Sequence, residues 1–330
     1  EGYWVLGGCP RLGVAPIEVS DGPHGLRHQS GAADNLGLSE SDPAVCFPTA
    51  SASACSFDVD LLRRMGEAIG DEAREQGVAV VLGPGVNMKR SPLCGRNFEY
   101  FSEDPFLAGT LGAAYIQGVQ SRGVGTSLKH FACNNQETHR LISDSVVDDR
   151  ALHELYLEPF RLAVEQGRPW TVMTAYNLLN GTYCSENRWL MEDLGRNAWG
   201  FDGAYVCDWG AESSNVDSLP AGLDLVMPGT RPDYRADVAE AVRAGRIPAS
   251  RLDEAVRRVL EIHRKHERAR DVVRIRDLDA RLEVAREVAE QSAVLLKNEG
   301  ALPLEPGARI AVIGAFAKHP RYQGAGSSKI

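Results

Sequence analysis

The chain contains 330 residues with a mass of 35.9 kDa, and its 43% apolar and 25% charged residues are the composition of an ordinary globular protein. With 36 basic and 45 acidic residues it carries a formal net charge of −9, which disfavours nucleic acids and anionic membrane surfaces as partners. No apolar run approaches the roughly 20 residues that are needed to span a bilayer.

Short apolar segments alternate with amphipathic segments along the first 270 residues. The apolar segments are rich in β-branched residues and predict buried parallel strands at 17–19, 78–82, 124–128, 171–175, 204–207 and 223–227. The amphipathic segments predict helices at 58–76, 148–165, 233–244 and 249–268. This alternation predicts an α/β fold, and its length favours a (β/α)8 barrel of the TIM type over residues 1–270.

The sequence pattern changes after residue 270. A long amphipathic helix is predicted at 277–298, within a helical linker that covers 271–304. The apolar run at 309–314 predicts a fresh strand, and a segment rich in Gly and Ser follows at 322–328. We therefore expect residues 305–330 to begin a second α/β domain that the sequence enters only in part.

Polar residues gather in the loops that follow five of the predicted strands. In a barrel these loops meet at one mouth, so their side chains are expected to lie together. A carboxylate beside an aromatic ring suits a sugar, because the ring stacks on a pyranose face while the carboxylate reaches the anomeric carbon. The residues singled out in this way are Asp21, Arg96, Lys129, His130, Tyr176, Asp208 and Trp209.

Several of these residues also have an ordinary structural interpretation. Asp208 could cap the helix that follows it, and Arg96 and Asp21 could form an ion pair that ties two loops together. Lys129 could pair with a structural acid, and His130 could be a core histidine bonded to the backbone. Taken singly, the residues leave these alternatives open.

Taken together and in order, the same loops resemble glycoside hydrolase family 3. The similar segments are 21–27, 95–105, 129–131, 134–138, 175–177, 207–210 and 221–229. The resemblance spans essentially the whole chain and is strongest to the bacterial β-glucosidases, in which an α/β sandwich domain follows the barrel. It implies a barrel that is incomplete at the N-terminus, where the family's first helix is missing, followed by the first strand of the sandwich domain.

The resemblance also implies an activity, the hydrolysis of terminal non-reducing β-D-glucosyl residues with retention through a covalent glycosyl-aspartate. Asp208 matches the family's nucleophile, with Cys207 in place of a serine, and Trp209 matches the aromatic wall of the sugar site. Tyr176 matches the tyrosine that lies near the nucleophile. The residues that match the family's hydroxyl-binding side chains are Asp21, Arg96, Lys129 and His130.

The general acid/base is expected from the C-terminal domain, because the resemblance places it beyond residue 330. That domain is therefore an expected partner, together with a β-glucoside or oligosaccharide substrate, and assembly into a homo-oligomer stays open. Glu99, Glu103 and Glu137 lie in suitable loops, but the resemblance gives them structural duties. The loop that carries the acid–base pair of the family's N-acetylglucosaminidases is absent, so His139 is not expected to be catalytic.

Neither a cofactor nor a metal is expected. The histidines lack metal-ligand spacing, and the seven scattered cysteines include no CxxC pair, which predicts free thiols in a reducing, cytoplasmic location. The Gly-Pro-Gly turn at 83–85 lacks the pattern of a phosphate-binding loop. Glycoside hydrolysis requires none of these groups.

Three alternatives accompany this interpretation. A β-xylosidase of the same family would differ in the room beside Asp21 for the hydroxymethyl group at C5. A non-catalytic sugar-binding protein would bind glycosides without activating Asp208. A phosphate-binding barrel aldolase would use Lys129 as its Schiff-base residue, which requires a desolvated lysine with a lowered pKa.

Overall fold

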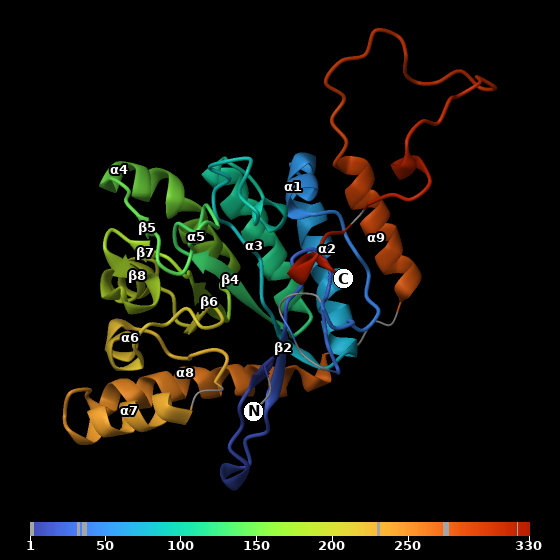
Figure 1. The fold of residues 1–330 in the computed structure, drawn as a ribbon. Helices are drawn as coiled ribbons and strands as arrows, with labels where there is room; N and C mark the ends of the chain where they lie inside the picture. The colour runs from blue at the N-terminus through green and yellow to red at the C-terminus, as the bar shows by residue number, and fades with distance from the viewer. Residues whose placement is uncertain (1–2, 32–33, 35–37, 230–231, 273–276, 322) are drawn as a thin grey trace.

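A six-stranded sheet forms the centre of the computed structural model, which describes residues 3–31, 34, 38–229, 232–272, 277–321 and 323–330. The strand order is β1-β2-β3-β4-β6-β9, in which β1 is antiparallel to β2 and every other neighbouring pair is parallel. The sheet curls into part of a barrel (Figure 1), so the predicted α/β fold with an incomplete barrel is confirmed. The strands are β1 (Val5–Leu6), β2 (Ile17–Ser20), β3 (Val78–Val81), β4 (Gly125–Phe131), β6 (Thr171–Thr174) and β9 (Ala204–Cys207), and a small second sheet has β5 (Asp144–Ser145), β7 (Leu178–Leu179) and β8 (Thr182–Tyr183).

The central strands follow the apolar sequence pattern because both of their faces are covered. Every residue of β3, β4, β6 and β9 is buried, which confirms the predicted strands in these four regions. β4 extends beyond its predicted end and contains Lys129 and His130. Its pairing with β6 is irregular between Leu128 and Phe131. The side chains of Lys129 and His130 each have a charged neighbour within 4 Å.

Helices α2 (Val59–Glu75) and α3 (Pro105–Ser121) lie side by side and pack against β3 and β4 respectively (Figure 1). Each begins at an aspartate, Asp58 or Asp104, whose side chain accepts a backbone hydrogen bond from the first turn. The two helices approach closely because Gly118 has no side chain. A Cβ at that position would lie 2.1 Å from a backbone oxygen of α2.

The remaining helices differ from the predicted ones mainly in regularity and at their ends. The helix predicted at 148–165 alternates between α-helical and π-helical turns, and Pro159, which has no backbone N–H, lies within it. The helix predicted at 277–298 ends at Gln291. No helix in the described part of the chain is long and apolar enough to cross a membrane. Besides α2 and α3, the α-helices of the described residues are α1 (Ala50–Ser53), α4 (Asp149–Ala151), α5 (Glu158–Leu162), α6 (Asn215–Ala221), α7 (Pro232–Arg243), α8 (Ala249–Arg268) and α9 (Leu278–Gln291). Segments of π-helix lie at Leu152–Tyr156, Ala163–Gly167 and Trp189–Ala198.

The strand predicted at 223–227 is not formed, and this prediction is wrong. The segment runs beside β9 but makes only an isolated bridge, between Val206 and Leu225. The Asp224 carboxylate accepts a hydrogen bond from the backbone N–H of Tyr205 at 2.9 Å. In a regular sheet, a backbone carbonyl of the neighbouring strand would accept this hydrogen bond. A side chain therefore replaces part of the strand ladder.

The strand predicted at 309–314 is also not formed. Ile310, Val312 and Ile313 are exposed, and no strand among the described residues pairs with this segment. An apolar strand needs a sheet that satisfies its backbone groups and covers its side chains. The sequence pattern alone is therefore insufficient to form a strand here.

The chain beyond α9 returns to the barrel after a long exposed segment (Figure 1). Residues 326–328 form a single helical turn, and the C-terminus lies near α2 in Figure 1. The domain limits 1–270, 271–304 and 305–330 stay predictions. Within the last two ranges, residues 273–276 and Tyr322 lie outside the described part of the chain.

A buried carboxylate, Glu72, ties the loop before α1 to α2. It is 4% exposed, and both of its oxygens lie within hydrogen-bonding distance of the Val45 backbone nitrogen, at 3.2 and 3.1 Å. Burial raises the pKa of Glu72 to about 7, although the Val45 hydrogen bond and the charge of Arg281 oppose the rise. The nearby charge of Glu75 raises it further.

Glu72→Gln is expected to flatten the pH dependence of stability. The pKa of Glu72 is raised from 4.5 to about 7 on folding, so its contribution is complete below pH 4.5 and is lost as the pH rises through 7. The loss amounts to roughly 3 kcal/mol, at about 1.4 kcal/mol per pKa unit. Urea unfolding at about pH 5 and about pH 8 measures the effect. We expect a larger fall in the free energy of unfolding for the wild type and for the exposed control Asp60→Asn than for Glu72→Gln, and equal falls would contradict the assignment.

Candidate active site

A pocket of about 200 Å³ lies at the carboxyl ends of the central strands. Six of the seven predicted site residues line it, and the seventh, His130, contacts two of them. The structure thus brings together residues from five separate strand ends, as the barrel prediction requires. The lining residues are Trp4, Asp21, Leu82, Arg96, Phe98, Lys129, Arg140, Met173, Tyr176, Asp208, Trp209, Ala325, Gly326 and Ser327.

Asp208 follows β9 directly and is 7% exposed. Its Oδ1 atom accepts the N–H of Trp209 at 2.8 Å, whereas its buried Oδ2 atom has no hydrogen-bond partner among the described residues. Oδ2 lies 3.9 Å from Arg96 Nη1 and 3.5 Å from His130 Nε2. Burial raises the pKa of Asp208, and the charges of Arg96 and Lys129 oppose the rise. Oδ2 is therefore a buried carboxylate oxygen with two nitrogen neighbours and no hydrogen bond among the described residues, on a residue that lines the pocket.

Four charged side chains form a buried network beside Asp208. Arg96 is hydrogen-bonded to Glu99, whose side chain is completely buried. Lys129 Nζ lies 3.2 Å from Asp21 Oδ1 and 3.4 Å from Glu99 Oε2. The two cations and two carboxylates compensate each other, so the network can remain charged without water.

The network favours the ionised forms of Glu99 and Lys129. Burial alone would raise the pKa of Glu99, but the charges of Arg96 and Lys129 outweigh burial and lower it. Burial alone would lower the pKa of Lys129, but Asp21 and Glu99 outweigh burial and raise it. Glu99 is thus a structural carboxylate. The pKa of Lys129 is raised, whereas a Schiff-base mechanism needs a lysine with a lowered pKa.

His130 is buried and neutral. Arg96 Nη2 lies 2.7 Å from its Nε2, and the Tyr100 hydroxyl lies 2.9 Å from its Nδ1. Burial lowers the pKa of His130, and the positive charges of Arg96 and Lys129 lower it further. The side chain of Asn87 fixes the His130 backbone by accepting from its N–H at 2.6 Å and donating to its carbonyl at 2.8 Å. His130 is therefore part of the charged site and is not a core histidine bonded to the backbone.

Aromatic rings form part of the pocket wall. The rings of Trp4 and Trp209 are 5.0 Å apart, and Trp209 Nε1 donates to the carbonyl of Tyr3 at 3.1 Å. The Tyr176 hydroxyl donates to the Trp209 carbonyl at 3.2 Å, and the Arg140 guanidinium lies 4.3 Å from the centre of the Tyr176 ring. Such a wall can stack on the apolar face of a pyranose.

Sequence analysis missed several pocket residues. Arg140 lies in the loop that follows β4 and pairs with Glu137 at 2.7 Å. Its position two residues after the 134–138 segment could have pointed to it. Trp4 was visible as part of an aromatic pair near the start of the sequence. The segment 325–327 was assigned to the second domain alone, but the returning chain places it at the pocket.

The pocket does not contain a second carboxyl that is free to act with Asp208, as far as the described residues show. Asp21 is the other carboxylate in its lining, and it is paired with Lys129. Glu103 is exposed and Glu137 is held by an arginine. The described residues also contain no group of three or more His, Cys, Asp or Glu side chains that could hold a metal ion.

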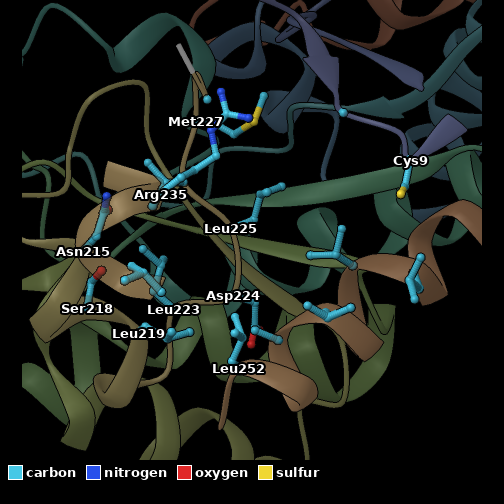
Figure 2. A pocket seen from close by; sticks show the side chains of 18 of the residues that line it. Cys9, Asn215, Ser218, Leu219, Leu223, Asp224, Leu225, Met227, Arg235 and Leu252 are labelled. Atoms are coloured by element: carbon cyan, nitrogen blue, oxygen red, sulfur yellow. The ribbon is translucent and has the colours of Figure 1, made fainter. Parts of the chain in front are cut away.

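A larger cavity of about 540 Å³ is lined by a different set of residues, ten of which Figure 2 labels. It is lined by the hairpin after β1, the segment 223–229 and helices α6, α7 and α8, and apolar side chains such as Leu225 and Leu252 contribute to its wall. The buried carboxylate in this wall, Asp224, is bound by three arginines. The two cavities share no lining residue. Asp208, whose Oδ2 atom has no hydrogen-bond partner among the described residues, lines the smaller one.

Comparison with known proteins identifies the family. A model of the glycosyl hydrolase family 3 N-terminal domain matches residues 37–262, which is more than half of the chain. The chain is 49% identical to a thermostable beta-glucosidase B from Acetivibrio thermocellus and 46% identical to an exo-alpha-(1->6)-L-arabinopyranosidase from Bifidobacterium longum. Its structure is similar to that of beta-glucosidase 3B from Thermotoga neapolitana in complex with alpha-D-glucose, with a TM-score of 0.90 and 40% identity. The chain belongs to glycosyl hydrolase family 3.

The matches cover nearly all of this chain but less than half of each relative. The two sequence matches span 99% of the chain and 44% of each relative, and the structural match spans 98% of the chain and 46% of the Thermotoga protein. The predicted family and its incomplete barrel are confirmed by these comparisons.

Proposed function

We propose that the protein hydrolyses terminal, non-reducing β-D-glucosyl residues, with Asp208 as its nucleophile. The observation that carries the proposal is that Asp208, whose Oδ2 atom has no hydrogen-bond partner among the described residues, lines a pocket together with Trp209 and the cations Arg96 and Lys129. Relatives named beta-glucosidase at 49% and 42% identity support this substrate class.

In the proposed reaction, Asp208 Oδ2 attacks the anomeric carbon and forms a glycosyl-aspartate ester while the bond to the aglycone oxygen breaks. That oxygen takes a proton from a general acid. A water molecule then attacks the same carbon, gives a proton to the same acid/base residue, and releases Asp208 as a carboxylate. Two successive displacements retain the configuration at the anomeric carbon. Neither a cofactor nor a metal takes part in these steps.

The size and lining of the pocket favour one sugar unit. A volume of about 200 Å³ is below the roughly 300–1,000 Å³ of sites for drug-sized ligands. Asp21 offers acceptor atoms for sugar hydroxyls, and Arg96 and Lys129 offer donors. These features support attack on the terminal residue of a glycoside, with the remainder of the substrate outside the pocket.

We further propose that the general acid/base comes from an α/β sandwich domain that begins at residues 305–330. The described pocket has no second free carboxyl, and a retaining glycosidase needs one about 5–5.5 Å from the nucleophile. Segment 325–327 already reaches the pocket, which supports a position for that domain over the barrel mouth. The barrel domain would then cover 1–270 and the linker 271–304.

A second candidate function is the hydrolysis of pentopyranosides, which the arabinopyranosidase from Bifidobacterium longum at 46% identity favours. The two functions differ in the space beside Asp21 for the hydroxymethyl group of glucose. Values of kcat/KM for aryl β-D-glucosides, β-D-xylosides and α-L-arabinopyranosides separate them. We expect the glucoside to be preferred, and a preference for either pentoside would overturn the choice of glucose.

Mechanism-based labelling tests the central proposal. A 2-deoxy-2-fluoro-β-glucoside with a dinitrophenolate leaving group needs no general acid for the first displacement, and it is expected to leave a fluoroglucosyl adduct on the peptide that contains Asp208. Peptide mass spectrometry locates the adduct, and Asp208→Asn is the control that should remain unlabelled. An adduct on another residue, or no adduct on the full-length protein, would reject Asp208 as nucleophile and support the non-catalytic alternative.

A further inference from the structure

The His130 ring lies between two hydrogen-bonding groups, one at each nitrogen. Arg96 Nη2 is 2.7 Å from Nε2, and the Tyr100 hydroxyl oxygen is 2.9 Å from Nδ1. His130 is 1% exposed and Tyr100 is completely buried. Water therefore does not compete for these contacts, and the two neighbours decide where the ring carries its proton.

The contacts with Arg96 and Tyr100 together determine which nitrogen is protonated. A guanidinium has only donors, so Nε2 of His130 is the unprotonated nitrogen that accepts from Arg96. A neutral imidazole carries one N–H, which is therefore on Nδ1 and is donated to the Tyr100 oxygen. The ring is neutral because burial lowers its pKa, and the charge of Arg96 acts in the same direction.

We infer that Tyr100 is a positioning residue that holds the His130 proton on Nδ1 and thereby keeps an N–H away from the nucleophile. The inference rests on the proposed function, in which Asp208 attacks the sugar. His130 Nε2 lies 3.5 Å from Asp208 Oδ2. A proton on Nε2 would point a donor at this oxygen, stabilise the resting carboxylate and make it a weaker nucleophile.

A proton on Nδ1 makes Nε2 the acceptor that Arg96 Nη2 engages at 2.7 Å. The same tautomer thus serves two purposes, because it holds the guanidinium beside the nucleophile and directs no ring N–H at Asp208 Oδ2.

The Tyr100 hydroxyl is held firmly in place. Asn134 Nδ2 donates to it at 3.3 Å, and the rings of Tyr100 and His130 meet edge to face with centres 5.9 Å apart. A Cβ on Gly85 would lie 2.8 Å from the Tyr100 ring, so this ring requires a glycine at that position. The Gly-Pro-Gly turn at 83–85 thus has a packing role beside Tyr100.

The position of the proton can be observed directly. In protein labelled with ¹⁵N at histidine, long-range ¹H–¹⁵N correlation spectra distinguish the Nδ1–H from the Nε2–H tautomer, and His130→Gln identifies the His130 signals. We expect wild-type His130 to show the Nδ1–H form. Tyr100→Phe removes only the hydroxyl and leaves a buried Nδ1–H without its acceptor, so we expect part of the population to carry the proton on Nε2 although Arg96 still opposes it.

Kinetics then test the consequence for the nucleophile. The value of kcat/KM for a dinitrophenyl β-glucoside reports the attack step, and Tyr100→Phe is expected to lower it about tenfold, the effect of one altered buried hydrogen bond. Tyr115→Phe is the matched control, because Tyr115 is also buried and its hydroxyl has no partner among the described residues. We expect this control to keep both the tautomer and kcat/KM.

Three results would overturn the inference: an Nε2–H form in the wild type, an unchanged Nδ1–H form in Tyr100→Phe, or a kcat/KM for Tyr100→Phe equal to that of Tyr115→Phe. Failure of the proposed function gives a different pattern. In that case neither the wild type nor a variant hydrolyses the glucoside, while the spectra still show whether Tyr100 determines the His130 tautomer.

Discussion

Asp208→Gly is expected to lower kcat/KM for a dinitrophenyl β-glucoside by about 10⁴-fold or more, because the attacking carboxylate is lost while the rest of the pocket remains. Added azide is expected to restore turnover, since it can enter the space left by the missing side chain and attack the same face of the sugar. The product should then be the α-glucosyl azide, which chromatography and NMR identify.

The control for this experiment is Asp60→Asn, which changes an exposed carboxylate at the start of α2, far from the pocket lining. We expect it to retain wild-type kcat/KM. Activity that persists in Asp208→Gly, or an azide product of β configuration, would reject Asp208 as the residue that forms the covalent intermediate.

Asp224→Ala is expected to lower the free energy of unfolding by about 3–5 kcal/mol, the cost of leaving buried charges without their partner. The Asp224 side chain is completely buried and lies 2.6 Å from Arg196, 3.0 Å from Arg251 and 3.0 Å from Arg258. These arginine side chains are only 8–12% exposed. They would lose a shared carboxylate that also accepts the Tyr205 backbone N–H.

Urea unfolding measures this effect. Asp193→Ala is a matched control, because Asp193 forms an exposed ion pair with Arg188 at 3.8 Å. Exposed pairs contribute about 0–1 kcal/mol, so the control should remain close to the wild type. If the two variants were equally stable, Asp224 would not be the centre of a stabilising network.

The overall fold was largely predictable because burial imposes a simple pattern on its strands. Segments such as 78–82 and 204–207 are apolar on both faces, and in an α/β chain such segments are almost always central parallel strands. The position of Asp208 followed from the same rule, since loops after parallel strands share one edge of the sheet.

The local interpretation of Asp208 was less certain, because a carboxylate before a helix can be either a cap or a free group. The structure distinguishes the two: Ser214 caps α6, and Asp208 bonds to Trp209. Such a choice depends on where the helix begins, and helix ends are poorly determined by sequence.

The features that could not be predicted depend on contacts between distant parts of the chain. The side chain of Asp224 disrupts the strand expected at 223–227, and no pattern of apolar residues reveals such a replacement. Arg140 and Ser327 reach the pocket through the path of their loops. Lys129 remains within a buried strand because Asp21 lies opposite it, which only the three-dimensional arrangement shows.

The assembly of the pocket from both ends of the sequence has a consequence for protein synthesis. Trp209 is anchored to the carbonyl of Tyr3, and Ser327 lines the same pocket from a segment far along the chain. On the ribosome, the contact between Tyr3 and Trp209 can therefore form only after β9 has emerged, and the pocket wall is incomplete until residue 327 has left the exit tunnel. The sheet can form earlier, but a nascent chain cannot enclose a ligand beside Asp208 until this whole region has been made.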